Sequence, residues 1–173
     1  NGGVLLYPTD TVWGLGCDAM NEDAIARIMD IKHRPAEKSF ILLMADARQL
    51  RKYLANPYPD LEDLLQSFTT PTTLIYPQAL HLPTVLLGEQ DSIAVRIPQD
   101  PFCRSLIKRC GTPIVSTSAN LSGQPTPSFF AEIAEAIKSN VDYVVKWKQD
   151  DSTPASPSAI YRIDEDGEMT RLR

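Results

Sequence analysis

Short apolar segments alternate with segments of helical periodicity along most of this chain, and that order constrains the fold more than any other feature. The run VLLY at residues 4–7 ends at Pro8 and is typical of a buried strand. Near the C-terminus the helical patterns stop and strands follow one another, the last two joined by a turn at Asp166-Gly167. We predict strands at residues 4–7, 40–44, 72–76, 93–97, 113–117, 143–145, 159–163 and 168–172.

Helical segments are indicated by apolar residues that recur every three or four positions, as at Ile25, Ile28 and Met29. Asn21 can cap that helix, and Pro35 disfavours helical geometry at the residue before it, so the helix should end near His33. We predict helices at residues 22–33, after Asp46, at 61–68, at 102–109 and at 129–138.

This pattern predicts an α/β fold of mixed type, in which an open, twisted mixed sheet is flanked by helices. A chain of 173 residues can bury roughly 70% of its unfolded surface, so it needs no disulfide or structural metal. No linker or repeat divides it, and the stretch 149–157, rich in Asp, Ser and Pro, is typical of a loop. We therefore expect residues 1–173 to form a single domain.

Charge and reactive residues exclude several classes of protein. The net charge of −5 argues against a broad face for duplex nucleic acid and suits a local site for one small polyanion. Two histidines and three scattered cysteines without a CxxC pair favour neither a Ser-His-Asp triad nor a metal cluster, so we predict no protein-bound metal. The free cysteines, and the lack of an apolar run of about 20 residues, predict a cytoplasmic protein without a membrane span.

The glycines at Gly14 and Gly16 belong to a segment that matches the dinucleotide fingerprint GxGxxA. That fingerprint turns from a strand directly into a helix, whereas here six residues separate Tyr7 from Gly14 and the helix begins only after Asn21. We interpret these glycines as positions where the backbone packs closely or bends. No Walker A sequence is present either, so a nucleotide site would not be a P-loop.

Three polar segments carry groups that suit phosphates and carboxylates. Residues 8–11 (PTDT) follow a strand, residues 32–35 (KHRP) with Lys38 place cations at a helix C-terminus, and residues 116–123 (STSANLSG) hold four hydroxyls and an amide. Turn chemistry and the helix dipole explain each segment taken alone. Their order along the chain favours a shared function.

The segments 7–16 (YPTDTVWGLG), 32–35 (KHRP), 92–98 (SIAVRIP) and 116–123 (STSANLSG), followed by 157–160 (PSAI), resemble the YrdC family in order and over nearly the whole chain. Its best-understood members are threonylcarbamoyl-AMP synthases. The resemblance implies an open mixed sheet with a concave cavity that holds ATP and L-threonine. No segment corresponds to the second domain of longer members, so the chain resembles the short form.

The resemblance also implies a reaction. The amine of L-threonine captures bicarbonate, and the carbamate attacks the α-phosphate of ATP, with Mg²⁺ accompanying the nucleotide. Pyrophosphate leaves, and a separate tRNA threonylcarbamoyl transferase receives the product. Alignment and charge neutralisation are the main requirements of such a step, so hydroxyls and cations suffice.

Carried over residue by residue, the family's sites fall on these positions. Arg96 would pair with the amino acid's carboxylate, which its planar fork suits. Lys32 and Arg34 would neutralise phosphate charge, and Asn120 would shape the hydroxyl-rich loop. The L-threonine site comprises Thr11, Arg96, Ser116 and Ser158, and the ATP site comprises Arg34, Lys38, Ser92, Ser118, Thr126 and Arg171.

Departures from the family pattern and alternative functions stay open at this point. Thr70-Pro71-Thr72 replaces a familiar Pro-Gly-Pro, and Lys38 and Leu43 stand where some longer members place an asparagine and a histidine. One alternative is a carbamoyl-adenylating enzyme like the domain of hydrogenase maturation, and another is a paralogue with altered activity. The third is a module that binds tRNA or double-stranded RNA, for which the acidic charge predicts weak binding.

Overall fold

The fold was analysed in a computed structural model that describes residues 2–33 and 40–173. Within these residues, nine strands form one sheet in the order β7-β1-β2-β6-β3-β5-β4-β8-β9. Three neighbouring pairs, β1 with β7, β3 with β5 and β4 with β8, are parallel, and the other pairs are antiparallel. The predicted mixed sheet is therefore confirmed. The strands are β1 Leu5–Tyr7, β2 Gly14–Asp18, β3 Ile41–Leu43, β4 Thr72–Tyr76, β5 Ile93–Arg96, β6 Ile114–Ser118, β7 Tyr143–Val144, β8 Ala159–Ile163 and β9 Met169–Arg171.

The helices begin and end where their capping residues predict. The Asn21 side chain accepts a hydrogen bond from Ala24 N at 2.9 Å, and His33 closes the helix in the left-handed conformation. Asp46 and Asp100 cap two further helices in the same way. The α-helices are α1 Glu22–Lys32, α2 Ala47–Arg51, α3 Leu61–Ser67, α4 Pro101–Cys110 and α5 Glu135–Lys138, with 3-10 turns at Thr84–Leu86, Glu89–Asp91 and Phe130–Glu132.

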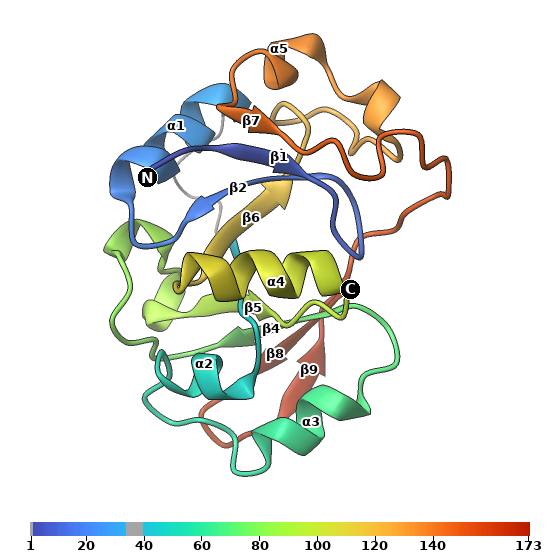
Figure 1. Ribbon diagram of the computed structural model, residues 1–173. Helices are drawn as coiled ribbons and strands as arrows, with labels where there is room; N and C mark the ends of the chain where they lie inside the picture. The colour runs from blue at the N-terminus through green and yellow to red at the C-terminus, as the bar shows by residue number, and fades with distance from the viewer. Residues whose placement is uncertain (1, 34–39) are drawn as a thin grey trace.

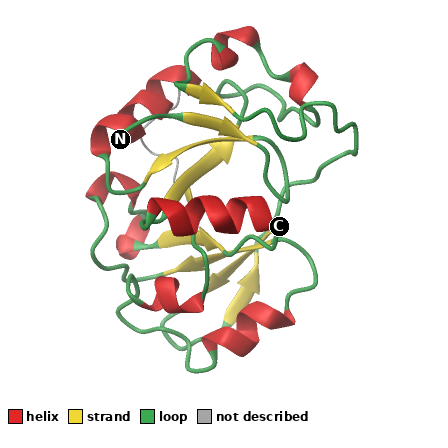
Figure 2. Ribbon diagram, viewed as in Figure 1, coloured by secondary structure: helices red, strands yellow, loops and turns green. Residues whose placement is uncertain are grey.

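The two faces of the sheet have different cores. The larger core collects alternate strand residues such as Leu15 and Val115 together with buried side chains of α1, α2, α3 and α5. The smaller core lies under α4, where Cys103 and Ile107 pack against Tyr7 and other residues of the opposite face. Figure 1 shows α4 crossing that face, and Figure 2 shows the helices placed around the sheet. Because α4 covers only part of its face, neighbouring strand residues there remain available for a site.

The sequence prediction missed one strand and is wrong about one helix. Residues 14–18 form β2, which was not predicted because glycine has low intrinsic strand propensity and hides the pattern. The close packing predicted for these glycines is confirmed at Gly16, where a Cβ would lie 2.6 Å from the Tyr7 ring. The predicted helix 129–138 is broken into a 3-10 turn and α5, since Ile133 and Ala134 adopt extended backbone angles. Ile133 is buried in the larger core, so tertiary packing overrides the local helical pattern.

Candidate functional site

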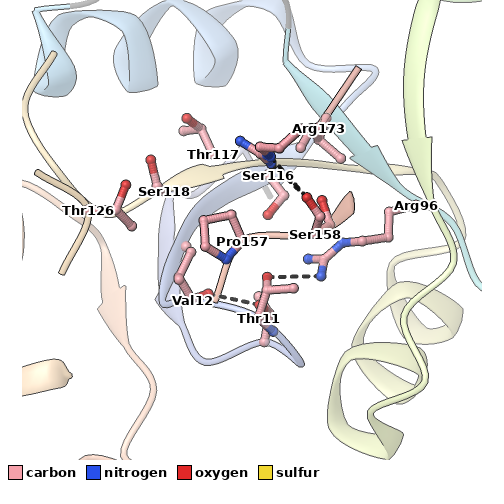
Figure 3. A pocket seen from close by; sticks show the side chains of 13 residues that line it. Thr11, Val12, Arg96, Ser116, Thr117, Ser118, Thr126, Pro157, Ser158 and Arg173 are labelled. Carbon is pink, nitrogen blue, oxygen red and sulfur yellow. Dashed lines mark hydrogen bonds between the residues drawn. The ribbon is translucent and has the colours of Figure 1, made fainter. Parts of the chain in front are cut away.

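A pocket of about 230 Å³ lies on the sheet face that α4 leaves partly open (Figure 3). Its walls come from strands β2, β3, β5 and β6, from the loop after β1, and from the segments that flank β8 and β9. More than half of its residues carry hydroxyl or guanidinium groups, which suits anionic and polar ligands. The lining residues are Thr9, Thr11, Val12, Gly14, Ile41, Arg96, Ser116, Thr117, Ser118, Thr126, Pro157, Ser158 and Arg173.

Strand register explains why residues distant in sequence meet here. Ser116 on β6 is directly opposite Gly16 on β2 and Ile41 on β3. Arg96 on β5 is opposite Thr73 on β4. Because side chains of directly paired residues point to the same face, these positions share the open face of the sheet.

Arg96 is the buried cation of the pocket, with 4% of its surface exposed. Its Nη1 donates to Asp10 Oδ1 at 2.7 Å and to Thr11 Oγ1 at 2.9 Å. Asp10 is itself held by Gln99, whose backbone N–H donates to Oδ2 at 3.2 Å. Among the described residues, Arg96 Nε has no hydrogen-bond partner although it is buried. One edge of the guanidinium is therefore fixed by protein, while Nε is buried without a hydrogen-bond partner among the described residues.

The hydroxyls beside Arg96 are fixed by neighbours. The Tyr7 hydroxyl donates to Ser116 Oγ at 2.9 Å, and the Ser158 and Thr73 hydroxyls share a hydrogen bond of 2.8 Å. Arg173 donates from Nε and Nη2 to the Ser158 carbonyl at 3.1 and 2.9 Å. In Figure 3, Thr11, Arg96 and Ser158 gather on one side of the pocket, and Ser118 and Thr126 lie on the other. The pocket therefore has two distinct ends.

The loop that follows β6 is held by Lys32. This lysine is 1% exposed, and its Nζ donates to the backbone carbonyls of Ser118 and Asn120. Its own carbonyl accepts from Ser122 N at 2.8 Å. The Asn120 side chain donates to the carbonyls of Leu121 and Gln124, at 3.0 and 2.9 Å. The predicted role of Asn120 in shaping this loop is confirmed.

The comparisons with known proteins agree with this architecture. A family model described as Sua5_yciO_yrdC, telomere recombination, matches residues 1–173. The chain belongs to this family.

Two relatives of this chain carry the same name. A protein of Pseudoalteromonas translucida (strain TAC 125) named threonylcarbamoyl-AMP synthase is 41% identical over 147 residues, which cover 83% of this chain and 79% of that protein. A protein of Idiomarina loihiensis with the same name is 39% identical over 163 residues, which cover 91% of this chain and 86% of that protein.

Solved structures of the family share the fold. The structure of P. abyssi Sua5 complexed with L-threonine matches 99% of this chain with a TM-score of 0.85 and 30% identity. This chain spans about half the length of that protein, since the match covers 50% of it. E. coli YciO matches 99% of this chain, with a TM-score of 0.81 and 28% identity, and the match covers 82% of YciO.

Six of the predicted site residues of this Sua5/YciO/YrdC-family chain line the pocket. Three others that the structure describes, Lys32, Ser92 and Arg171, do not. Ser92 precedes the first residue of β5, whereas Arg96 is the last residue of that strand. Ser92 lines a separate hollow beside the turn after β8. Arg171 is exposed and donates from Nε to the carbonyl of Arg173. The predictions for Arg34 and Lys38 lie outside the described residues. The six lining residues are Thr11, Arg96, Ser116, Ser118, Thr126 and Ser158.

Lys32 is predicted to neutralise phosphate charge, and that role stays a prediction. In the structure it does not line the pocket, and its Nζ donates to two backbone carbonyls. Its place in the last turn of α1 brings its side chain to the loop after β6. Lys32 therefore helps to fix the backbone of that loop.

Sequence reasoning missed Arg173 and the contribution of Thr9. Arg173 lies two residues after the predicted Arg171, and no motif distinguishes the two arginines. Thr9 Oγ1 accepts from Thr11 N at 3.0 Å and donates to Val12 O at 2.8 Å, so it shapes the loop that presents Thr11. The PTDT segment carried that signal, since short hydroxyl side chains favour such local bonds.

The described residues offer little to a metal ion. They contain no group of three or more His, Cys, Asp or Glu side chains placed to hold one. Asp10, the carboxylate beside Arg96, is already engaged by Arg96 and by Gln99 N. Across the same part of the chain, no helix has both the length and the apolar character that a membrane span requires.

Proposed function

We propose that this chain is an L-threonylcarbamoyladenylate synthase, a nucleotidyltransferase that forms threonylcarbamoyl-AMP and pyrophosphate from L-threonine, bicarbonate and ATP. One observation carries the proposal. The four residues assigned to L-threonine, which come from four distant segments, surround a single pocket: Thr11, Arg96, Ser116 and Ser158. Relatives about 40% identical are named threonylcarbamoyl-AMP synthase, and the P. abyssi Sua5 structure is complexed with L-threonine.

L-threonine would bind at the Arg96 end of the pocket. Its carboxylate would accept from the Arg96 guanidinium, which lines the pocket, while Asp10 holds Nη1. A charge-assisted bond to a buried guanidinium is stronger than one between neutral groups. The hydroxyls of Thr11, Ser116 and Ser158 would orient the amine and the threonine hydroxyl.

ATP would bind at the opposite end of the pocket, near Ser118 and Thr126. Besides Arg96, the described lining residues include one further cation, Arg173, which would contact the phosphates. Arg34 and Lys38 remain proposed ATP ligands from the family resemblance. Lys32 would act through the loop that carries Ser118 and Asn120, because its two hydrogen bonds fix the backbone at those residues.

The chemistry requires alignment more than covalent help from the protein. Attack of the threonine nitrogen on bicarbonate forms the N–C bond of a carbamate and releases water. A carbamate oxygen then attacks the α-phosphorus of ATP, the bond to the β-phosphate oxygen breaks, and pyrophosphate leaves with that electron pair. Arginine side chains near the phosphates would offset the negative charge of this step.

Mg²⁺ enters this proposal as part of the substrate MgATP. Magnesium is usually bound through substrate phosphates and one or two carboxylates. The described lining residues include no carboxylate, so no step is assigned to a protein-held ion. The product would pass to a separate tRNA threonylcarbamoyl transferase, and direct contact of this chain with tRNA would be weak.

The test is the substrate dependence of pyrophosphate release by the purified protein. Release should require L-threonine and bicarbonate together, and L-alanine should replace L-threonine poorly because it lacks the hydroxyl. ATP turnover that proceeds equally without L-threonine, or that yields ADP, would contradict the proposal. If pyrophosphate forms with ammonia-derived carbamoyl groups instead of L-threonine, the carbamoyl-adenylating alternative would be favoured.

A further inference from the structure

The Tyr7 side chain extends across strand β2 on the same face of the sheet as the pocket. Tyr7 lies on β1, two strands from Ser116 on β6, yet its hydroxyl donates to Ser116 Oγ at 2.9 Å. Its surface is fully buried, and it does not line the pocket. The Tyr7 phenol can therefore act on a ligand only through Ser116, which does line the pocket.

Gly16 on the intervening strand makes this crossing possible. A Cβ at Gly16 would lie 2.6 Å from Tyr7 Cε1 and 2.7 Å from the Val115 carbonyl oxygen, closer than real atoms approach. Any side chain at this position would therefore displace the tyrosine ring or the strand. The glycine in the GLG segment leaves a slot that the Tyr7 ring fills.

The direction of the hydrogen bond determines what Ser116 can do. A tyrosine hydroxyl has one proton, and Tyr7 uses it toward Ser116, so Ser116 Oγ is an acceptor in that bond. The Ser116 proton is then free to be donated elsewhere, and Ser116 lines the pocket. Burial raises the pKa of the Tyr7 hydroxyl well above its usual value, so the phenol keeps its proton at every working pH.

We infer that Tyr7 is a positioning residue that orients the Ser116 hydroxyl as a hydrogen-bond donor to an anionic or carbonyl oxygen of the ligand. The inference rests on the proposed function, in which that oxygen belongs to L-threonine or to its carbamate. It assigns Tyr7 and Gly16 a role in amino-acid binding at the floor of the pocket.

The experiment compares Tyr7→Phe with Tyr76→Phe. Tyr76 is a matched control because it is also buried, but its hydroxyl has no partner among the described residues, and it lies outside the pocket. Tyr7→Phe should raise the KM for L-threonine about 3- to 10-fold, as expected for one lost hydrogen bond, and leave the KM for ATP nearly unchanged. Tyr76→Phe should change neither constant.

A double-mutant cycle with Ser116→Ala distinguishes an effect of Tyr7 that acts through Ser116 from a general loss of protein stability. If Tyr7 acts through Ser116, adding Tyr7→Phe to Ser116→Ala should cause no further rise in the KM for L-threonine. Gly16→Ala gives a second variant, which keeps the phenol but displaces it, and should show the same threonine-selective loss. If the Tyr7→Phe protein does not fold, the Gly16→Ala protein is measured in its place.

The outcomes distinguish this inference from the proposed function. A wild-type protein that binds no L-threonine overturns both. A wild-type protein that binds L-threonine, with Tyr7→Phe unchanged in its KM, overturns the inference alone. Equal losses from Tyr7→Phe with and without Ser116 also overturn it, since the two effects would then be independent.

Discussion

Arg96 and Asp10, 86 residues apart in sequence, form a buried ion pair with 2.7 Å between Nη1 and Oδ1. The pair has two consequences for the site. It offsets the positive charge of the arginine inside the protein. It also fixes the plane of the guanidinium, whose Nε has no hydrogen-bond partner among the described residues. Arg96 therefore has a structural role and a proposed ligand-binding role, and the two must be tested separately.

The first prediction separates these roles with Arg96→Lys and Arg96→Ala. Lysine can keep a charge beside Asp10 but lacks the planar fork, so Arg96→Lys should retain most of the stability. Its affinity for L-threonine should fall, but by less than the roughly 30- to 1,000-fold cost of losing a charge-assisted pair outright. Arg96→Ala should show that full loss and also a lower melting temperature, since the largely buried Asp10 loses its cationic partner. Thermal unfolding and L-threonine titration check both. A stable Arg96→Lys protein with wild-type L-threonine affinity would remove Arg96 from the L-threonine site.

The second prediction uses neighbouring arginines as a matched pair. Arg173 lines the pocket and Arg171 does not, although Arg171 ends β9 and Arg173 follows it by only two residues. Arg173→Ala should raise the KM for ATP about tenfold, in line with a hydrogen bond to a charged group. Arg171→Ala should leave it within about twofold, as for a typical surface substitution. Steady-state kinetics at saturating L-threonine give both values, and the reverse ranking would restore the original assignment of Arg171.

The third prediction concerns Lys32, whose Nζ donates to the buried backbone near Ser118 and Asn120. Lys32→Met should lower the free energy of unfolding by roughly 1.5–3 kcal/mol, because carbonyls that bonded a charged donor lose it. The exposed Lys52→Met serves as control and should change little. Urea unfolding measures both. Should Lys32→Met keep full stability and lose ATP affinity alone, its expected role at the phosphates would be correct after all.

The fourth prediction addresses RNA. The chain carries 17 basic and 22 acidic residues, so the isolated protein should bind tRNA weakly. Whatever binding occurs should fall steeply with salt, because phosphate contacts release counterions. Fluorescence anisotropy with labelled tRNA across a salt series measures this. Tight binding that persists at high salt would favour the RNA-binding alternative.

Much of the fold could be predicted because its signals are local. Asn21, Asp46 and Asp100 cap helices through their own side chains, and apolar runs such as 72–76 match observed strands. The family motifs also located most of the pocket, since each motif lies at a strand end or in an adjoining loop.

The remaining features depend on contacts that local patterns do not report. Gly14 and Gly16 belong to a strand in which Gly16 leaves room for Tyr7, a requirement set by the neighbouring strands β1 and β6. Ser92 precedes β5 and Arg96 is its last residue, so the two residues line different hollows at opposite ends of one short strand. Which of Arg171 and Arg173 lines the pocket likewise depends on the path of the chain after β9, where Arg173 donates to the Ser158 carbonyl.

Direct detection of the product tests the central claim most directly. The purified protein is incubated with MgATP, L-threonine and ¹³C-labelled bicarbonate, and the nucleotides are analysed by mass spectrometry. The proposed reaction predicts threonylcarbamoyl-AMP that carries the label, with pyrophosphate formed in equal amount, and no such product when L-threonine is omitted. Unlabelled product, or ATP consumption that yields only ADP and phosphate, would contradict the assignment.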